Sequence, residues 1–381
     1  MSRPHLLVID QSTSATKVFV FDDQARVVHR VAIEHRQFYP QPGRVEHDAL
    51  EIFDNTVAAI RQVIAESGIP PASLASLSIT NQRETAVAWD LETGQPVHHA
   101  LVWQDERGQA YCDELIRAGA GSLVRERTGL LIDSYFSASK LRWLIENVPE
   151  ASRLANAGRL ACGTIDAWLI WKLTAGQVFA CDATNASRTM LFDIHRLQWD
   201  AELLGLWHLD KAKFPEVRAS DARFGTVQAA GLPQGLPIIG AIGDSHAALV
   251  GQGGYAAGAA KVTYGTGSSA MVNVGTSCPE APDGVVAAIA WQDRDGTHYA
   301  FEGNIHHTGD TLRWARDEMG LYRTHEEAEA LARSIPDNGG VYLVPAFSGL
   351  GAPYWKHGMR ALITGLSRAS GRAQVVRAAL E

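Results

Sequence analysis

The first twenty residues contain the pattern that most restricts how this chain can fold. Residues 6–9 are an uninterrupted apolar run, Leu-Leu-Val-Ile, and Asp10 follows directly. A hydroxyl-rich stretch, Ser-Thr-Ser, occupies residues 12–14, and residues 15–21 are rich in β-branched and aromatic side chains. Residues of those types fit a half-buried strand, whereas clusters of Ser and Thr suit turns. The pattern therefore predicts a β-hairpin with a carboxylate at the end of its first strand.

This predicted hairpin has two interpretations. In the first, the backbone N–H groups and hydroxyls of Ser12, Thr13 and Ser14, with the ammonium of Lys17, surround phosphate oxygens. Asp10 would then hold Mg²⁺, either directly or through its water ligands. In the second, the hairpin is an ordinary one with a polar tip, since Asp is common at strand ends. The hairpin alone does not decide between them.

Length and composition exclude several classes of protein. A chain of 381 residues with 46% hydrophobic and 20% charged residues is expected to form two or three globular domains. The net charge of −8 argues against general nucleic-acid binding and against an anionic membrane surface. No signal peptide or long apolar run is present, so we expect a cytoplasmic protein that does not enter a membrane. Scattered cysteines favour the same reducing compartment over a disulfide or zinc framework: Cys112, Cys162, Cys181 and Cys278.

The rest of the chain alternates predicted strands with predicted helices, which favours an α/β fold over an all-helical one. Asp48 and Glu51 have the spacing of a capping box, and apolar residues then recur at helical spacing. Further helices are expected after residues 135–140 and over residues 164–171.

Two of the predicted strands run into polar residues. Residues 77–79 are followed by Asn-Gln-Arg-Glu at residues 81–84, and residues 238–242 are followed by Gly-Asp-Ser-His at residues 243–246. In open α/β sheets, ligands bind at the edge where the strands end. We therefore expect functional side chains in these two polar stretches.

The opening pattern returns in the second half of the chain. Residues 261–264 are expected to form a strand, residues 265–269 (Gly-Thr-Gly-Ser-Ser) a turn, and residues 270–274 a second strand. Two such units suggest a duplicated fold with a cleft between the halves, in which each turn binds one end of a phosphate chain and closure excludes water. A glycine cluster at residues 251–254 is the expected boundary between the halves.

Longer strings resemble the signatures of one family. Residues 135–147, Tyr-Phe-Ser-Ala-Ser-Lys-Leu-Arg-Trp-Leu-Ile-Glu-Asn, resemble the first signature of the FGGY carbohydrate kinases. The second signature of this family has its counterpart in this chain at residues 361–366, 374–375 and 378–381. Strings similar to the glycerol kinases within that family lie at residues 81–85, 184–190 and 345–355. The resemblance extends over essentially the whole chain.

The resemblance implies a fold and an activity. The fold is an α/β one, the duplicated actin-like ATPase architecture, in which two RNase H-like domains flank a central cleft. We expect residues 1–250 to form the N-terminal domain, with the substrate and Mg/phosphate site, and residues 251–381 an incomplete C-terminal domain on the ATP-binding side. The implied activity is ATP-dependent phosphorylation of a terminal hydroxyl of a small polyol, with Mg-ATP in the cleft. Glycerol, giving glycerol 3-phosphate, is the best single candidate substrate.

The resemblance also implies roles for individual residues. Asp244 matches the catalytic aspartate, which accepts the proton of the substrate hydroxyl, and Asp10 matches the residue of the Mg²⁺ site. The expected substrate-binding residues are Arg83, Glu84, Trp103, Tyr135, Asp244 and Ser245. The expected ATP-binding residues are Ser12, Thr13, Ser14, Lys17, Gly265, Thr266, Gly267, Gly309 and Arg313. Structural roles are the alternative: Arg83 and Glu84 could pair with each other, and Trp103 could belong to the core.

Four positions depart from the glycerol kinase pattern. Ser12 stands where Gly is usual and Lys17 where Arg is usual, and the other two lie in the substrate pocket. Ser245 stands where Gln is usual, and Ser269 where a Phe normally lines the carbon side of the pocket. Loss of an aromatic wall removes about 1–3 kcal/mol of apolar contact with a small ligand, so a larger and wetter pocket is predicted. The alternative function is therefore a kinase for a longer polyol or ketose of the erythritol, xylulose or ribulose type. Residues 81–84 argue against a xylulose kinase, which usually carries a Gly-Gln-Met-His-type string there.

Further departures concern regulation and the end of the chain. No Lys or Arg occurs between Arg223 and Lys261, where relatives inhibited by a sugar bisphosphate carry a basic residue, so we expect no such inhibition. The family continues beyond the position of Glu381 with a Gly-Gly-Ala-type segment that holds adenosine. We therefore expect a fragment, or else a short form that is defective in nucleotide binding. A polyol-binding regulatory protein is accordingly the alternative from another class. The family resemblance makes a homodimer or homotetramer the expected assembly.

Overall fold

The computed structural model describes residues 4–347, 349–356 and 358–381, and the chain divides into two compact units. Unit 1 comprises Met1–Gly258, Asn273–Glu280 and Ala287–Ala300, and unit 2 comprises Ala259–Val272, Ala281–Val286 and Phe301–Glu381. Ser348, within the string at residues 345–355, lies outside the described residues.

A five-stranded sheet forms the centre of unit 1, with the strand order β13-β5-β1-β2-β3. Its strands are β1 (His5–Gln11), β2 (Ala15–Phe21), β3 (Val27–Glu34), β5 (Leu74–Asn81) and β13 (Ile238–Gly243). The predicted opening hairpin is confirmed, because β1 and β2 pair antiparallel with Asp10 opposite Lys17. β5 pairs parallel with both β1 and β13, so these three strands end at the same edge.

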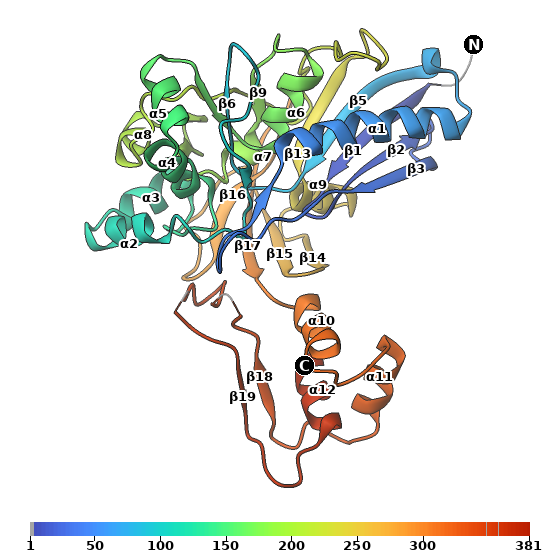
Figure 1. Ribbon diagram of the computed structural model, residues 1–381, viewed down its shortest axis with the longest axis vertical. Helices are drawn as coiled ribbons and strands as arrows, with labels where there is room; N and C mark the ends of the chain where they lie inside the picture. Colours follow the sequence, from blue (N-terminus) through green and yellow to red (C-terminus); the bar gives the residue numbers. More distant parts are fainter. Residues whose placement is uncertain (1–3, 348, 357) are drawn as a thin grey trace. The chain divides into compact units, whose positions relative to one another are not determined.

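Helix α1 (Ala49–Ser67) covers this sheet and contacts β2 and β3 (Figure 1). Asp48 caps the helix by accepting hydrogen bonds from the backbone N–H groups of Leu50 and Glu51, which satisfies donors that the first turn leaves unpaired. The predicted capping box is only half correct, since the carboxylate of Glu51 accepts from Arg36 on the preceding segment.

Short strands and helices build the rest of unit 1. The helices are α2 (Gln109–Arg117), α3 (Gly121–Thr128), α4 (Ser137–Asn147), α5 (Pro149–Asn156), α6 (Ile165–Leu173), α7 (Ala183–Ala186), α8 (Ala201–Leu206) and α9 (Asp244–Gly251), with a 3₁₀ turn at Pro71–Ser73. Two-stranded sheets pair β4 (Glu46–His47) with β7 (Ala100–Leu101), β6 (Val87–Asp90) with β8 (Leu160–Gly163), β9 (Ala180–Asp182) with β12 (Glu216–Arg218), and β10 (Phe192–Asp193) with β11 (Gln198–Trp199). The predicted helices after residues 135–140 and over residues 164–171 are confirmed as α4 and α6.

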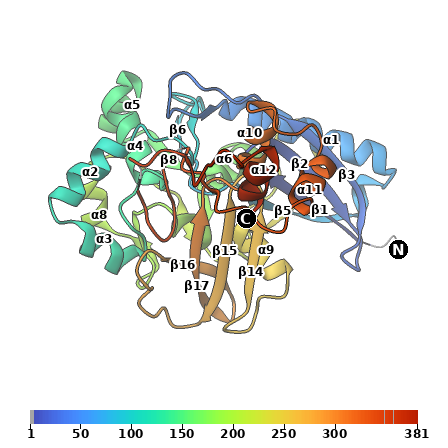
Figure 2. The same ribbon diagram turned by 90° about the horizontal axis from the view of Figure 1, so that it is seen from below.

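A second sheet has the strand order β14-β15-β17-β16 (Figure 2). Its strands are β14 (Ala260–Tyr264), β15 (Ser268–Gly275), β16 (Val286–Asp293) and β17 (Gly296–Ile305). β14 and β15 pair antiparallel, which confirms the predicted return of the strand–turn–strand pattern.

The remaining elements of unit 2 are three helices and a pair of strands. They are α10 (Gly309–Asp317), α11 (His325–Arg333), α12 (Arg372–Leu380), β18 (Tyr342–Val344) and β19 (Leu362–Thr364). A small apolar core joins the helices through Ala315, Tyr322, Ala328 and Val376. Over the described parts of both units, no helix has the length and apolar character that crossing a membrane requires.

Candidate active site

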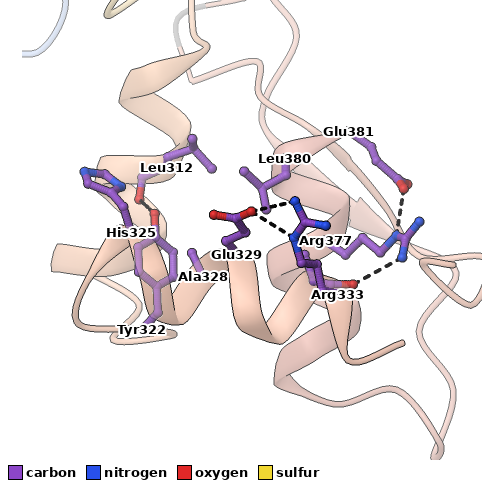
Figure 3. Close-up of a pocket in the computed structure, with 10 residues that line it drawn as sticks. Leu312, Tyr322, His325, Ala328, Glu329, Arg333, Arg377, Leu380 and Glu381 are labelled. Atoms are coloured by element: carbon purple, nitrogen blue, oxygen red, sulfur yellow. Dashed lines mark hydrogen bonds and ion pairs between the residues drawn. The ribbon is translucent and has the colours of Figure 1, made fainter. Parts of the chain in front are cut away.

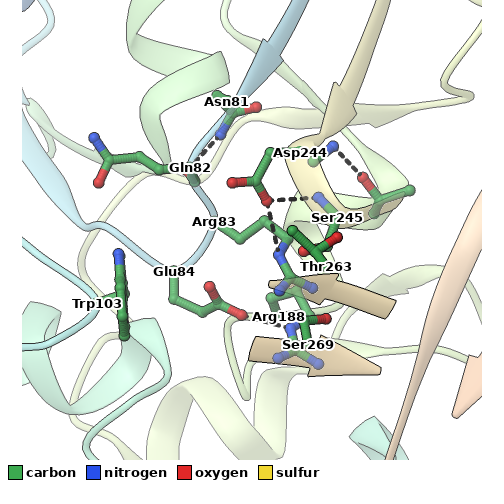
Figure 4. A network of polar contacts seen from close by, with 12 residues as sticks. Asn81, Gln82, Arg83, Glu84, Trp103, Arg188, Asp244, Ser245, Thr263 and Ser269 are labelled. Atoms are coloured by element: carbon green, nitrogen blue, oxygen red, sulfur yellow. Dashed lines mark hydrogen bonds and ion pairs between the residues drawn. The ribbon is translucent and has the colours of Figure 1, made fainter. Parts of the chain in front are cut away.

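The ends of β1, β5 and β13 bring several predicted site residues of unit 1 together. The strand register sets Asn81 at the end of β5 opposite both Gln11 of β1 and Gly243 of β13. Asp10 lies one residue before Gln11, and Asp244 follows Gly243 as the first residue of α9. The edge predicted from the two polar stretches is therefore where carboxylates and Arg83 gather (Figure 4).

Asp244 is held in position by two neighbours. The Nε of Arg83 lies 3.3 Å from its Oδ1, and the backbone N–H of Ser245 donates to the same oxygen at 2.6 Å. The side chain of Asp244 is nevertheless 41% exposed, whereas that of Arg83 is buried. Loss of hydration raises the pKa of Asp244, the Arg83 charge opposes this, and the nearby Glu84 and Asp10 charges add to it. Asp244 is thus an accessible, restrained carboxylate with heightened basicity, the properties that a general base requires.

Glu84 forms a buried ion pair with a residue that sequence reasoning did not assign to the site. The Nε of Arg188 lies 2.6 Å from Oε1 of Glu84, and the two side chains are 0% and 2% exposed. The guanidinium also lies over the ring of Phe136, 5.0 Å from its centroid. Glu84 has a positive φ of 61°, which is uncommon for a residue other than glycine and is frequent at functional sites. Arg188 belongs to the string at residues 184–190, and a charge among small residues was the one sequence signal for it.

Trp103 and Tyr135 form an aromatic pair beside the hairpin turn. Their ring centroids are 5.6 Å apart, and both side chains are half-buried. The indole N–H of Trp103 donates to the hydroxyl of Thr13 at 3.0 Å. Trp103 is therefore only half-buried, and its indole N–H bonds to the turn; its assignment to the substrate site stays a prediction.

The turn between β1 and β2 uses some of its own donors. Both the backbone N–H and the hydroxyl of Ser12 donate to the carbonyl of Ala15, at 2.9 Å each. The ammonium of Lys17 lies 3.1 Å from Oδ2 of Asp10. These contacts keep Ser12 occupied within the turn, whereas Ser14 is exposed at its tip.

A layer of neutral polar side chains fixes the backbone of this turn. The carbonyl of Thr13 accepts hydrogen bonds from Nε2 of His35 at 2.8 Å and from the amide of Gln37 at 2.7 Å. His47 donates in turn to the amide oxygen of Gln37 at 2.7 Å. Burial lowers the pKa of His35 and lowers that of His47 to about 3, so both rings are neutral at physiological pH. The carbonyl of Thr13 in this turn is therefore held by two uncharged donors, His35 and Gln37.

In unit 2, the predicted glycine turn packs against the start of α10. The backbone N–H of Gly309 donates to the carbonyl of Gly265 at 3.0 Å, and that of Asp310 donates to the carbonyl of Thr266 at 3.1 Å. A Cβ at Gly267 would lie 2.6 Å from a backbone carbonyl oxygen of β17, and one at Gly309 would lie 2.5 Å from that of Gly265. Only glycine fits such close approaches of two backbones.

A pocket of about 620 Å³ lies among the helices of unit 2 (Figure 3). Its walls combine apolar side chains with two ion pairs, Arg333 with Glu329 and Arg377 with Glu381. None of the predicted site residues is among the described residues that line it, although the exposed Arg313 follows the lining residue Leu312 on α10. Elsewhere within residues 4–347, 349–356 and 358–381, no cluster of three or more His, Cys, Asp or Glu side chains could hold a metal by itself.

Two family models match nearly the whole chain. The N-terminal domain of the FGGY family of carbohydrate kinases matches residues 5–251, and the C-terminal domain of that family matches residues 260–381.

Individual proteins are similar as well. Glycerol kinase 1 of Thermotoga maritima is 49% identical over 377 residues, which cover 99% of this chain and 77% of that protein. A glycerol kinase of Alkalilimnicola ehrlichii is 46% identical over 376 residues, covering 99% of this chain and 76% of its own length. The crystal structure of Plasmodium falciparum glycerol kinase with ADP superposes with a TM-score of 0.88 at 36% identity and covers 99% of this chain and 76% of that one.

The fold and the site define an α/β phosphotransferase, an enzyme that uses an alcohol group as acceptor. The chain belongs to the FGGY family of carbohydrate kinases. The α/β fold class and the family expected from the sequence are thereby confirmed. Membership of this kinase family implies a nucleoside triphosphate as the phosphoryl donor and the use of a divalent metal ion.

Proposed function

We propose that this protein transfers the terminal phosphoryl group of ATP to a terminal hydroxyl of glycerol, giving glycerol 3-phosphate. The similarity to glycerol kinases at 46–49% identity over 99% of the chain carries this proposal. The residues of unit 1 suit a small polyol: an Arg and a carboxylate can pair with vicinal hydroxyls, and aromatic rings can pack against the carbon edge.

Each residue of this group has a proposed task. Asp244 accepts the proton of the attacking hydroxyl, and its raised pKa brings its basicity closer to what the transfer requires. Arg83 restrains Asp244 and donates to a substrate hydroxyl, while Glu84 accepts a hydrogen bond from another. Trp103 and Tyr135 contact the carbon side of glycerol. Because phosphoryl transfer depends mainly on alignment and charge neutralisation, positioning is the main contribution of these residues.

Each of the two expected domains has a proposed role in binding ATP and its metal ion. We propose that residues 1–250 act as the domain for glycerol and the metal and residues 251–381 as the domain for ATP. Asp10 fits a Mg²⁺ site, since its carboxylate is 25% exposed at a strand end and Mg²⁺ commonly takes one or two carboxylates besides phosphate oxygens and water. Bound Mg²⁺ would neutralise charge on the phosphates. The phosphate ligands proposed from this chain are Thr13, Ser14, Lys17, Gly265, Thr266, Gly267, Gly309 and Arg313. Ser12 is left out of this set because its N–H and hydroxyl both donate to the carbonyl of Ala15.

A kinase for a longer polyol is the second candidate. It is favoured by Ser245, a short side chain directly beside Asp244. Ser269 offers weaker support than the sequence suggested, because its hydroxyl donates to the buried Glu302 at 2.7 Å and accepts from Lys261 at 3.1 Å within unit 2. A hydroxyl engaged in this way is less available for an added substrate hydroxyl.

A substrate panel tests both candidates in one assay. We expect kcat/KM for glycerol to exceed the values for erythritol, xylulose and ribulose, and a preference for any of these three would replace the first proposal by the second. Asp244→Asn should lower kcat by about 10²–10⁴-fold, the usual contribution of a general base. Asp54→Asn, the same change at an exposed position of α1, is the matched control and should leave kcat unchanged. Near-normal turnover by Asp244→Asn would refute the assignment of the base.

A further inference from the structure

A side chain of α7 bonds to the backbone directly before Asp244. The N–H of Gly243 donates to Oγ1 of Thr184 at 2.9 Å, across 59 residues of sequence. Thr184 is fully buried, and α7 contacts β13 along this end of the strand. The bond is therefore shielded from water. In such an interior a hydrogen bond is stronger than in water, and loss of the Thr184 hydroxyl would leave the buried N–H of Gly243 unsatisfied.

The direction of this bond is set by Asp182. The Thr184 hydroxyl donates to Oδ1 of Asp182 at 2.9 Å, so its single hydrogen is used there and a lone pair faces Gly243. Asp182 also accepts from both the backbone and the side-chain amide of Asn185 and from the hydroxyl of Ser220. These neighbours all donate to a buried carboxylate, which holds the Thr184 hydroxyl in one orientation.

The same segment supports the neighbouring strand end and Glu84. Asn185 and Asn81 exchange two amide hydrogen bonds, of 2.9 and 3.1 Å, and Asn81 stands opposite Gly243 in the sheet. Four residues after Thr184, Arg188 pairs with Glu84. Residues 182–188 therefore form hydrogen bonds or an ion pair with three residues of the candidate site, Gly243, Asn81 and Glu84.

Gly243 depends on an external restraint. A Cβ at this position would lie 2.8 Å from the Arg83 side chain, so the site accommodates only glycine unless Arg83 shifts. Glycine has the widest conformational freedom of any residue, and here it connects a strand to the helix that begins with Asp244. The hydrogen bond from Thr184 restricts the peptide on which the direction of Asp244 depends.

We propose that Thr184 is a positioning residue for phosphoryl transfer, which fixes the orientation of Asp244 through the backbone of Gly243. The proposal rests on the proposed function, because it assigns Thr184 to the base of that reaction. A displacement of about 1 Å at a reacting group costs on the order of 10²-fold in rate. Since Thr184 is fully buried and acts through the backbone of Gly243, its loss should affect kcat rather than KM.

The test compares three variants with the wild-type protein. Thr184→Val keeps the shape and removes the hydroxyl, and we expect kcat to fall by about 10–100-fold with KM for glycerol little changed. Thr184→Ser restores the hydroxyl and should return kcat to near the wild-type value. Thr56→Val on α1 is the matched control, because Thr56 is equally buried and its hydroxyl donates to a backbone carbonyl, that of Ile52 at 2.8 Å. It should leave kcat unchanged.

Each outcome decides the proposal. A folded Thr184→Val variant with normal kcat would overturn it, and so would equal loss in Thr184→Ser, which would indicate packing alone. A change in KM without a change in kcat would also overturn it. If Thr184→Val does not fold, Thr184→Ala and Thr184→Ser provide the same comparison of absent and present hydroxyl. Failure of the wild-type protein and of Thr56→Val to phosphorylate glycerol would instead count against the proposed function.

Discussion

The buried pair of Arg188 and Glu84 allows a direct test of what burial adds to an ion pair. The change is Arg188→Met, which keeps an unbranched side chain against Phe136 and removes the guanidinium. Opposite charges about 4 Å apart attract by about 4 kcal/mol at an effective dielectric constant of about 20. Breaking a buried pair costs about 3–5 kcal/mol, because the remaining charge has lost its compensation. We therefore expect Arg188→Met to lower the free energy of unfolding by about 3–5 kcal/mol.

Arg153→Met is the matched control. Arg153 lies 2.6 Å from Oε1 of Glu150, the same distance as in the buried pair, but the side chains are 60% and 50% exposed. Water screens such an exposed pair, so its loss should lower the free energy of unfolding far less than loss of the buried pair does. The two substitutions are chemically identical, and they differ in the burial of the pair that they break.

Urea unfolding of both variants at neutral pH measures the difference. The larger loss corresponds to a decrease in Tm of roughly 6–20 °C for a unit of this size. Adding Glu84→Gln to Arg188→Met should recover part of the lost stability, because the uncompensated buried charge is then removed. Equal and small effects of Arg188→Met and Arg153→Met would refute the reasoning, and so would a double variant less stable than Arg188→Met.

Three further predictions concern pH and regulation. Loss of hydration raises the pKa of Asp244, so kcat should fall as the pH decreases through that raised value; a pH–rate profile with its acid midpoint at or below about 3.9, the ordinary value for Asp, would contradict this. Burial and the charge of Asp182 raise the pKa of Asp166 to about 7, so the folded protein binds more protons at this site than the unfolded chain does. The free energy of unfolding should therefore decline as the pH rises from about 4 to about 7. Urea unfolding across this pH window should show a flatter dependence for Asp166→Asn, and an unchanged slope would contradict the assignment. Because the sequence has no Lys or Arg between Arg223 and Lys261, fructose 1,6-bisphosphate should not inhibit the enzyme, and a clear loss of activity in the kinase assay would show this to be wrong.

The sequence by itself determined the elements that depend on local patterns. The apolar run at residues 6–9 and the alternation that follows it predicted the β1–β2 hairpin, because the period of a strand is visible in its own residues. Asp48 marked the start of α1 for a similar reason, since a capping side chain accepts hydrogen bonds from the backbone N–H groups two and three residues later. The strings at residues 81–85 and 135–147 indicated the family, and with it the roles proposed for Asp244, Arg83 and Glu84.

Only the tertiary structure decided which side chains support those residues. Arg188 reaches Glu84 across 104 positions of sequence, and Thr184 reaches Gly243 across 59. Such pairings leave no periodic signal, because they depend on how separate segments pack together. A buried polar group must find a partner in whatever segment packs beside it, and the fold determines which segment that is.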